Sequence, residues 1–163
     1  MIGIISDTHD NISMIDKAVK KLNEREVRLI LHAGDYISPF TVKRFKPLNA
    51  QVIGVFGNNC AERNVLKKLF SKIGGDLRGF FAEIKIEGLK IALLHGHNEE
   101  LLHSLVDSKA YDLVAHGHTH RQNVQRKDKT LVINPGEVCG YLSGESTLAI
   151  VNLNTRNVEI LHL

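Results

Sequence analysis

Hydrophobic and polar positions follow two different periods in the first half of the chain, and each period predicts one type of element. Short apolar runs rich in branched residues are typical of buried strands, which we expect at 1–6, 27–32 and 51–56. Between the first two runs, apolar residues recur at three- and four-residue spacing and predict a helix. This stripe consists of Ile12, Ile15, Ala18, Val19 and Leu22.

The first helix has two candidate capping residues. Asn11 or Ser13 can cap it, and Asp16 would complete a capping box with Ser13. Asn11 also follows the first polar loop, so contact with a ligand is the alternative to capping.

Two further helices are expected before residue 75. Ser38-Pro39 places a capping hydroxyl before a proline, which is favoured at the first helical position, and this opens a short helix to about Phe45. Helical spacing recurs over 61–72, and Gly74-Gly75 ends that helix.

The pattern changes in the second half of the chain. Strands at 81–86 and 90–94 are separated only by Glu87-Gly88-Leu89, which predicts a hairpin. A helix over 99–106 and a strand over 113–115 follow. After these no helical spacing is evident, and antiparallel strands are expected at 123–126, 131–134, 147–152 and 157–161.

These elements predict a mixed α/β fold. Strands that are apolar on both faces must be covered on both sides, so the simplest arrangement is two packed mixed β-sheets flanked by helices, an αββα sandwich. A chain of 163 residues has the usual length of one domain, and we expect 1–163 to form a single domain.

Composition restricts the function only weakly. The formal net charge is +3 and the pI is near 8.9, but basic residues alternate with acidic ones and form no stripe with aromatics, so we expect no nucleic-acid partner. No apolar run approaches membrane-spanning length. Cys60 and Cys139 lack metal-site spacing and disulfide-scaffold density, which favours a cytoplasmic location. A homo-oligomer is left open.

Oxygen and imidazole side chains follow five of the predicted strands. Because the carboxyl ends of parallel strands meet at one edge of a sheet, we expect these side chains to lie close together. Alternate histidines at 116, 118 and 120 can aim rings at one point in an extended chain, although a solvated loop is the alternative for that stretch alone. The candidate ligands are Asp7, His9, Asp35, Asn58, His95, His118 and His120.

Seven donors exceed what one metal ion uses, and they fit two ions that share a bridging carboxylate. The donors are nitrogen and oxygen without thiolate, which suits Mn, Fe, Co, Ni or Zn and argues against a structural cysteine–zinc site. We therefore expect two divalent transition-metal ions per chain, with Mn or Ni favoured.

Five motifs, D-x-H, G-D, G-N, H-G-H and G-H-T-H in this order, resemble those of the calcineurin-like metallophosphoesterase superfamily. The short chain and its Asn134-Pro135-Gly136 resemble the small phosphodiesterase branch, which includes the retromer scaffold subunit. The resemblance implies a fold of the metallo-dependent phosphatase type. It also implies an enzyme that hydrolyses small phosphodiester substrates. The implied ligands of one ion are Asp7, His9 and His120. Those of the other are Asn58, His95 and His118, with Asp35 bridging both ions and a hydroxide between them as the nucleophile.

The chain departs from this resemblance at one catalytic position. Many members read G-N-H there, and the histidine assists the leaving group, whereas this chain reads Gly57-Asn58-Asn59-Cys60. Asn59 cannot donate a proton as an imidazolium can. His97 is the nearest replacement by motif and would lie over the phosphate; the alternative is a loop histidine bonded to the backbone.

Other residues near the motifs have simpler interpretations. His32 and His116 lie inside predicted strands and are expected to pack or to support the ligands rather than bind metal. Cys60 is expected to pack, with a reactive thiol as the alternative. Asn134 either orients the His118 loop or forms a plain turn.

Two other functional classes are compatible with these motifs. A non-catalytic protein-binding scaffold like the retromer subunit can tolerate substituted ligand positions, whereas all seven are intact in this chain. A nuclease would be expected to carry a recognition domain or a basic groove, and neither is evident. We therefore predict a metal-dependent phosphoric ester hydrolase, a phosphodiesterase.

Overall fold

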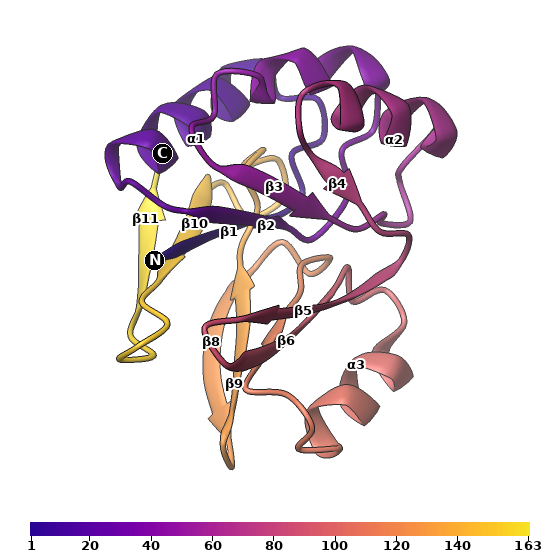
Figure 1. Cartoon of the computed structure of the whole chain (residues 1–163). Coiled ribbons are helices and arrows are strands. Elements are labelled where there is room, and N and C mark those ends of the chain that lie inside the picture. The colour runs from indigo at the N-terminus through magenta and orange to yellow at the C-terminus, as the bar shows by residue number, and fades with distance from the viewer.

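The chain folds into two β-sheets packed face to face, with helices on their outer faces (Figure 1). The computed structural model describes all 163 residues. This arrangement confirms the predicted αββα class. Its physical cause is that strands such as β1 (Ile2–Ile5) and β2 (Leu29–His32) are buried at every residue and must be covered on both faces.

The first sheet has six strands in the order β11-β10-β1-β2-β3-β4. β1 to β4 are parallel to one another, and β10 and β11 add an antiparallel pair beside β1. The further bounds are β3 (Gln51–Gly54), β4 (Asp76–Leu77), β10 (Thr147–Val151) and β11 (Val158–His162).

The second sheet has five strands in the order β5-β6-β7-β9-β8. Its three central strands are parallel, and the predicted hairpin of β5 and β6 is confirmed. β8 is an edge strand without a buried residue. The bounds are β5 (Phe81–Ile86), β6 (Leu89–Leu94), β7 (Leu113–Ala115), β8 (Gln122–Lys127) and β9 (Thr130–Pro135).

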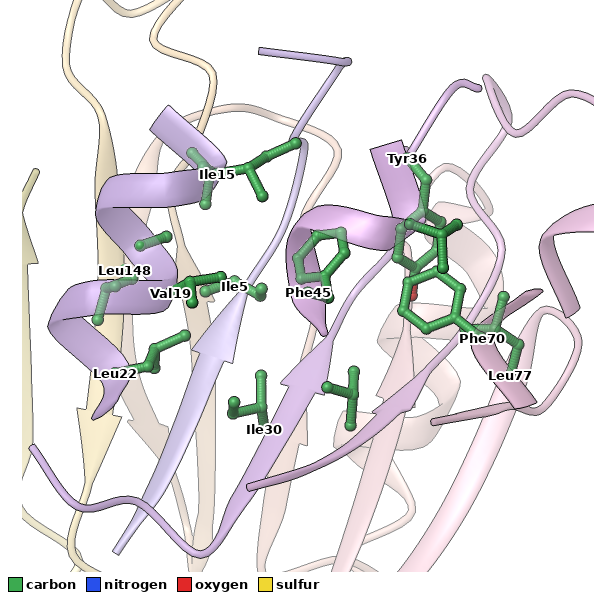
Figure 2. Close-up of a cluster of buried hydrophobic side chains, with 14 of the residues drawn as sticks. Ile5, Ile15, Val19, Leu22, Ile30, Tyr36, Phe45, Phe70, Leu77 and Leu148 are labelled. Atoms are coloured by element: carbon green, nitrogen blue, oxygen red, sulfur yellow. The ribbon is translucent and has the colours of Figure 1, made fainter. Parts of the chain in front are cut away.

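Three helical segments cover the outer face of the six-stranded sheet: α1 (Ile12–Glu24), the 3-10 helix η1 (Pro39–Phe45) and α2 (Arg63–Lys72). Figure 2 shows the apolar stripe of α1, with Val19 and Leu22, facing Ile5 of the sheet. Gly3 allows this close packing, because a Cβ at that position would lie 2.4 Å from Leu22 Cδ2. The fourth helix, α3 (Glu99–Asp107), packs on the outer face of the five-stranded sheet.

A second apolar layer lies between the two sheets. Side chains alternate along a strand, so Ile4 points into this layer while its neighbour Ile5 points toward the helices. Leu93 and Ile133 contribute from the opposite sheet. Apolar layers thus cover both faces of the first sheet. This burial fixes the register of its strands and the places where they end.

The short helix expected from Pro39 to Phe45 is confirmed and is a 3-10 helix, although the Ser38 hydroxyl does not cap it. The strand β4 was not predicted because only two residues pair, and the predicted capping box between Ser13 and Asp16 does not form. Asn11 caps α1 instead, accepting from the backbone N–H of Met14, while Asp16 accepts from Arg44 Nε at 2.8 Å. The partner Arg44 lies on η1, which local sequence does not reveal.

None of the helices is long and apolar enough to cross a membrane.

Candidate metal centre

The loops that follow β1, β2, β6 and β7 meet at one edge of the two sheets and hydrogen-bond to one another. The backbone N–H of Asp7 donates to Gly34 O at 3.0 Å, and that of Gly117 donates to His95 O at 2.9 Å. Several chain positions in these loops have left-handed φ values, which are uncommon for residues with side chains and concentrate at functional sites. They are Asp7, His9, Asp35, His118 and His120, with φ between 38° and 72°.

One cluster, which we call the Asp7 group, consists of Asp7, His9 and His120. Asp7 Oδ1 lies 3.6 Å from His9 Nε2 and 3.4 Å from His120 Nε2. The two imidazole rings are 5.0 Å apart between centroids. The three ligand atoms thus all lie within 4.8 Å of one another.

A second cluster, the Asp35 group, consists of Asp35 and His95 together with Asp7. Asp35 Oδ2 lies 3.3 Å from His95 Nε2 and 3.4 Å from His9 Nε2, so it faces both clusters at once. Asp7 Oδ1 is 4.0 Å from His95 Nε2. Asp35 Oδ2 and Asp7 Oδ1 each lie within 4.0 Å of histidine nitrogens from both clusters.

The lack of hydrogen-bond partners at several buried atoms indicates that these residues can hold divalent ions. Asp7 Oδ1, His9 Nε2 and His95 Nε2 are buried and have no hydrogen-bond partner. A buried polar atom without a partner is costly, and buried ligand atoms of this kind are expected where a cation binds. Their chemistry, carboxylate oxygen and imidazole nitrogen, matches first-row transition metals.

The outward ring nitrogens of two histidines are held by acceptors that leave Nε2 free as a ligand. His95 Nδ1 donates to the Ala33 carbonyl at 2.8 Å, and His120 Nδ1 donates to Glu137 Oε2 at 2.7 Å. Partners of this kind fix the ring orientation and the tautomer of a metal-binding histidine.

Glu137 is a functional residue that sequence reasoning missed. Its fully buried carboxylate also accepts from Cys139 Sγ, from Ser143 Oγ and from the backbone N–H groups of 141, 142 and 143. Burial alone would raise its pKa, but the hydrogen bonds from Cys139, His120 and Ser143 lower it to about 2. The only signal in the sequence was an acid directly after the Asn134-Pro135-Gly136 turn.

His118 and His97 lie next to the Asp35 group. The His118 ring is 5.1 Å from the His95 ring, a separation like that of His9 from His120. The backbone N–H of His118 donates to Asp7 Oδ2 at 3.1 Å. His97 is exposed, with its ring 5.6 Å from His95 and 6.2 Å from His118, so it lies at the rim.

The two asparagines after β3 are placed differently from each other. Asn58 is exposed and its side chain makes no hydrogen bond, whereas Asn59 donates to Asp35 from its backbone N–H at 2.9 Å and from Nδ2 at 2.8 Å. The structure therefore brings Asn59, and not Asn58, into contact with Asp35. Gly57 is required in this loop, because a Cβ would lie 2.0 Å from Asp35 Oδ1.

Opposing effects set the charges of the site. Burial would raise the pKa of Asp7 and of Asp35, yet the neighbouring histidines lower both, and Asn59 adds to the effect on Asp35. Burial would lower the pKa of His9 and His95, yet Asp7 and Asp35 raise both. The pKa values of His97 and His118 are lowered, first by burial and then by His95. Both carboxylates are thus ionised and attract cations.

Two histidines outside the clusters have supporting roles, as predicted. His32 Nδ1 accepts from the Gly34 N–H at 3.2 Å, and its Nε2 lies 3.4 Å from Thr8 Oγ1. His116 is buried with Nδ1 3.2 Å from Gly117 O.

The contacts of two further residues decide between their alternative interpretations. Cys60 is buried and accepts from the Gly57 N–H, which favours packing over a reactive thiol. Asn134 does both things considered for it: Nδ2 donates to Gly117 O at 2.9 Å, and Oδ1 accepts from the Gly136 N–H.

Known proteins resemble this chain over nearly its whole length. The family described as the calcineurin-like phosphoesterase superfamily domain matches residues 1–156. Phosphodiesterase MJ0936 of Methanocaldococcus jannaschii is 41% identical over 152 residues, covering 93% of this chain and 92% of that protein. The solved structure of an archaeal phosphodiesterase is 39% identical, covers 99% of both chains and has a TM-score of 0.96.

The Vps29 structure from Chaetomium thermophilum shares the fold with a TM-score of 0.71 at 16% identity, covering 99% of this chain and 96% of that one. With the family match over 156 of 163 residues, the two clusters and the shared fold, the chain belongs to the calcineurin-like phosphoesterase superfamily.

Proposed function

We propose that this protein is a divalent-metal-dependent phosphodiesterase with a dinuclear centre. The observation that carries the proposal is the set of three buried ligand atoms without partners, Asp7 Oδ1, His9 Nε2 and His95 Nε2. They belong to two overlapping clusters that Asp35 Oδ2 faces together. Packing alone gives no reason to bury these groups unpaired.

In this proposal the ions divide the ligands between them. Asp7, His9 and His120 would hold one ion, His95, His118 and Asn58 would hold the other, and Asp35 would serve both. The assignment of Asn58 as a ligand rests on the sequence motif alone. Its side chain is exposed and must turn inward to bind. Mn or Ni are the ions we expect, with Fe, Co and Zn compatible with the same donors.

When bound, such a pair of ions supplies an activated water and offsets charge on the attacking and leaving oxygens. The protein's own residues hold the geometry for this chemistry. Asn59 fixes Asp35 through two hydrogen bonds, and Glu137 fixes the ring of His120. We expect His97, whose ring lies 5.6 Å from the His95 ring at the rim, to contact a phosphate oxygen of a bound diester.

A diester substrate is supported by the relatives, since the protein that is 41% identical is named a phosphodiesterase. The scaffold alternative is less well supported, because every ligand of both clusters is present and several are unpaired. A cytoplasmic location, a small substrate and the absence of a nucleic-acid partner remain predictions.

The test is hydrolysis of bis(p-nitrophenyl) phosphate by protein freed of metal with a chelator and reloaded with Mn. We expect activity only after reloading, and loss of that activity in His9→Ala. The exposed His103 is the matched control, because His103→Ala removes an imidazole that belongs to neither cluster and should keep the parental rate. Equal activity with and without metal would contradict the proposal.

A further inference from the structure

A pocket of about 210 Å³ opens directly beside the metal centre. It shares His95 with the Asp35 group and extends past His97 toward Phe80, Leu94 and Leu101. A molecule whose phosphate lies at the clusters would therefore place one of its ester groups at the mouth of this pocket.

Phe80 forms the outer wall of the pocket and is 45% exposed. It lies in the short segment between β4 and β5, which is anchored by a hydrogen bond from the Phe56 N–H to Gly79 O. Single exposed apolar side chains are common on proteins and need no explanation by themselves. The position of this one, beside the candidate metal ligands, is what requires an explanation.

The Phe80 ring is held by three neighbours. Arg63 Cζ lies 4.7 Å from the ring centroid, and the rings of Phe56 and His97 pack against it edgewise at 6.1 Å and 6.0 Å. Arg63 does not line the pocket, whereas Phe80 does and keeps nearly half of its surface exposed. A fixed aromatic surface binds a flat ligand without first losing much conformational freedom.

The lining suits a neutral aromatic ring. Phe80, Leu94 and Leu101 are apolar, and the polar contributions beyond His95 come from His97 and Asn98, with no carboxylate, lysine or arginine on the wall. An apolar cavity of about 150 Å³ is known to bind benzene. A pocket of about 210 Å³ thus has room for a substituted phenyl ring.

We propose that this pocket binds an aromatic ester substituent of the phosphodiester substrate, with Phe80 as its stacking surface. The proposal rests on the function proposed above and narrows its substrate class to aryl phosphodiesters rather than dialkyl ones. Phe80 determines specificity and does not take part in the chemistry.

The test uses two phosphonates that the protein cannot hydrolyse at the P–C bond. Phenylphosphonate and methylphosphonate share the anionic phosphonate group, and they differ only in carrying a phenyl ring or a methyl group on phosphorus. Binding of each to Mn-loaded protein is measured by calorimetry for the parent, Phe80→Ala and Phe80→Leu. The matched control is Phe40→Ala, which removes a comparably exposed phenylalanine that does not line the pocket.

We expect the parent and Phe40→Ala to bind phenylphosphonate on the order of tenfold more tightly than methylphosphonate, the scale of an aromatic contact. Phe80→Ala should lose this preference and keep its methylphosphonate affinity, and Phe80→Leu should keep only part of the preference. The methyl probe and a circular dichroism spectrum show whether each variant is folded.

Two results would overturn the proposal, and they differ. If both probes bind all proteins equally while Mn-dependent diester hydrolysis persists, the pocket has no aromatic subsite but the phosphodiesterase assignment stands. If neither probe binds and no diester is cleaved, the proposed function fails and the subsite fails with it.

Discussion

The two halves of the metal centre are supported very differently by the rest of the protein. In the Asp7 group, one carboxylate and one ring are fixed from behind: the His118 N–H holds Asp7, and Glu137 holds His120. The other half includes Asp35 and His95, which Asn59 and the Ala33 carbonyl hold. Its two further proposed ligands are not held in this way, since the His118 ring makes no hydrogen bond and Asn58 is exposed, whereas in the first half only His9 lacks a partner. Preorganised ligands lose less freedom when they bind, so the first ion should bind more tightly than the second.

Removal of the carboxylate that is proposed to bridge the two ions should have the largest effect. Asp35→Asn should abolish diester hydrolysis and reduce the metal stoichiometry, because one carboxylate faces both His9 and His95. The loss should exceed the roughly 10- to 100-fold typical of removing an outer partner of a ligand. The measurement is kcat together with Mn content by elemental analysis.

Asp112→Asn is the control for Asp35→Asn, since it alters a carboxylate that is also hydrogen-bonded but belongs to neither cluster. Wild-type rate and stoichiometry in Asp35→Asn would show that the bridge is wrongly assigned.

The leaving-group side of the centre can be examined through Asn59, whose amide is already used by Asp35. Positioned proton donors contribute about a hundred- to ten-thousand-fold, most of all for basic leaving groups. Without one, rates across a series of substituted phenyl phosphodiesters should depend steeply on the pKa of the leaving phenol. Because every diester in the series carries a phenyl ring, binding of the ring in the pocket stays the same across the series.

Asn59→His should make that dependence shallower if the imidazole reaches the ester oxygen. If His97 already supplies the proton, the parent will show a shallow slope that becomes steep in His97→Ala. A shallow slope that neither change alters would reject both ideas, the lack of a proton donor because of Asn59 and the donor role of His97.

Glu137→Gln should selectively weaken binding of the first ion, which we expect to bind more tightly. The amide cannot accept all the hydrogen bonds of the carboxylate, so the His120 ring loses its fixed orientation. Affinity for the first ion should fall about 10- to 100-fold, with a change in the visible absorption of the Co-loaded protein.

Glu83→Gln is the matched control for Glu137→Gln, because Glu83 accepts from Tyr111 and belongs to neither cluster. Unchanged first-ion affinity in Glu137→Gln would mean that Glu137 does not cause the difference between the halves.

The smallest effect concerns His32, which supports loops of both halves through Thr8 and Gly34. Burial lowers its pKa to about 3, against about 6.5 in the unfolded chain. Above pH 6.5 the ring is neutral in both states and contributes no pH dependence. Between pH 6.5 and about 3 the unfolded state binds a proton that the folded state does not, so stability falls by up to about 1.4 kcal/mol per pH unit.

His32→Asn keeps an acceptor near Gly34 and removes this titration. Denaturant unfolding between about pH 6.5 and pH 4 should therefore show a smaller loss of stability in the variant than in the parent. Identical slopes would mean that His32 is protonated in the folded protein.

The layers of the fold could be predicted from the sequence, and so could the meeting of most of the proposed metal ligands at one edge, because both depend on local signals. Strands that are apolar throughout require covering on both faces, and parallel strands bring Asp7 and Asp35 to one edge. Glu137 was not predictable, since its contact with His120 depends on how the loop after β9 folds back. The same holds for Asp16, whose partner Arg44 lies on another element, and for Asn59, whose contact with Asp35 needs the close approach at Gly57.

The measurement that tests the central claim most directly is calorimetric titration of metal-free protein with Mn. We predict saturation at two equivalents in two steps, the first tighter by about tenfold or more, with Glu137→Gln reducing the difference. Saturation at one equivalent would contradict the dinuclear centre, and two steps of equal affinity would contradict the unequal support of its halves.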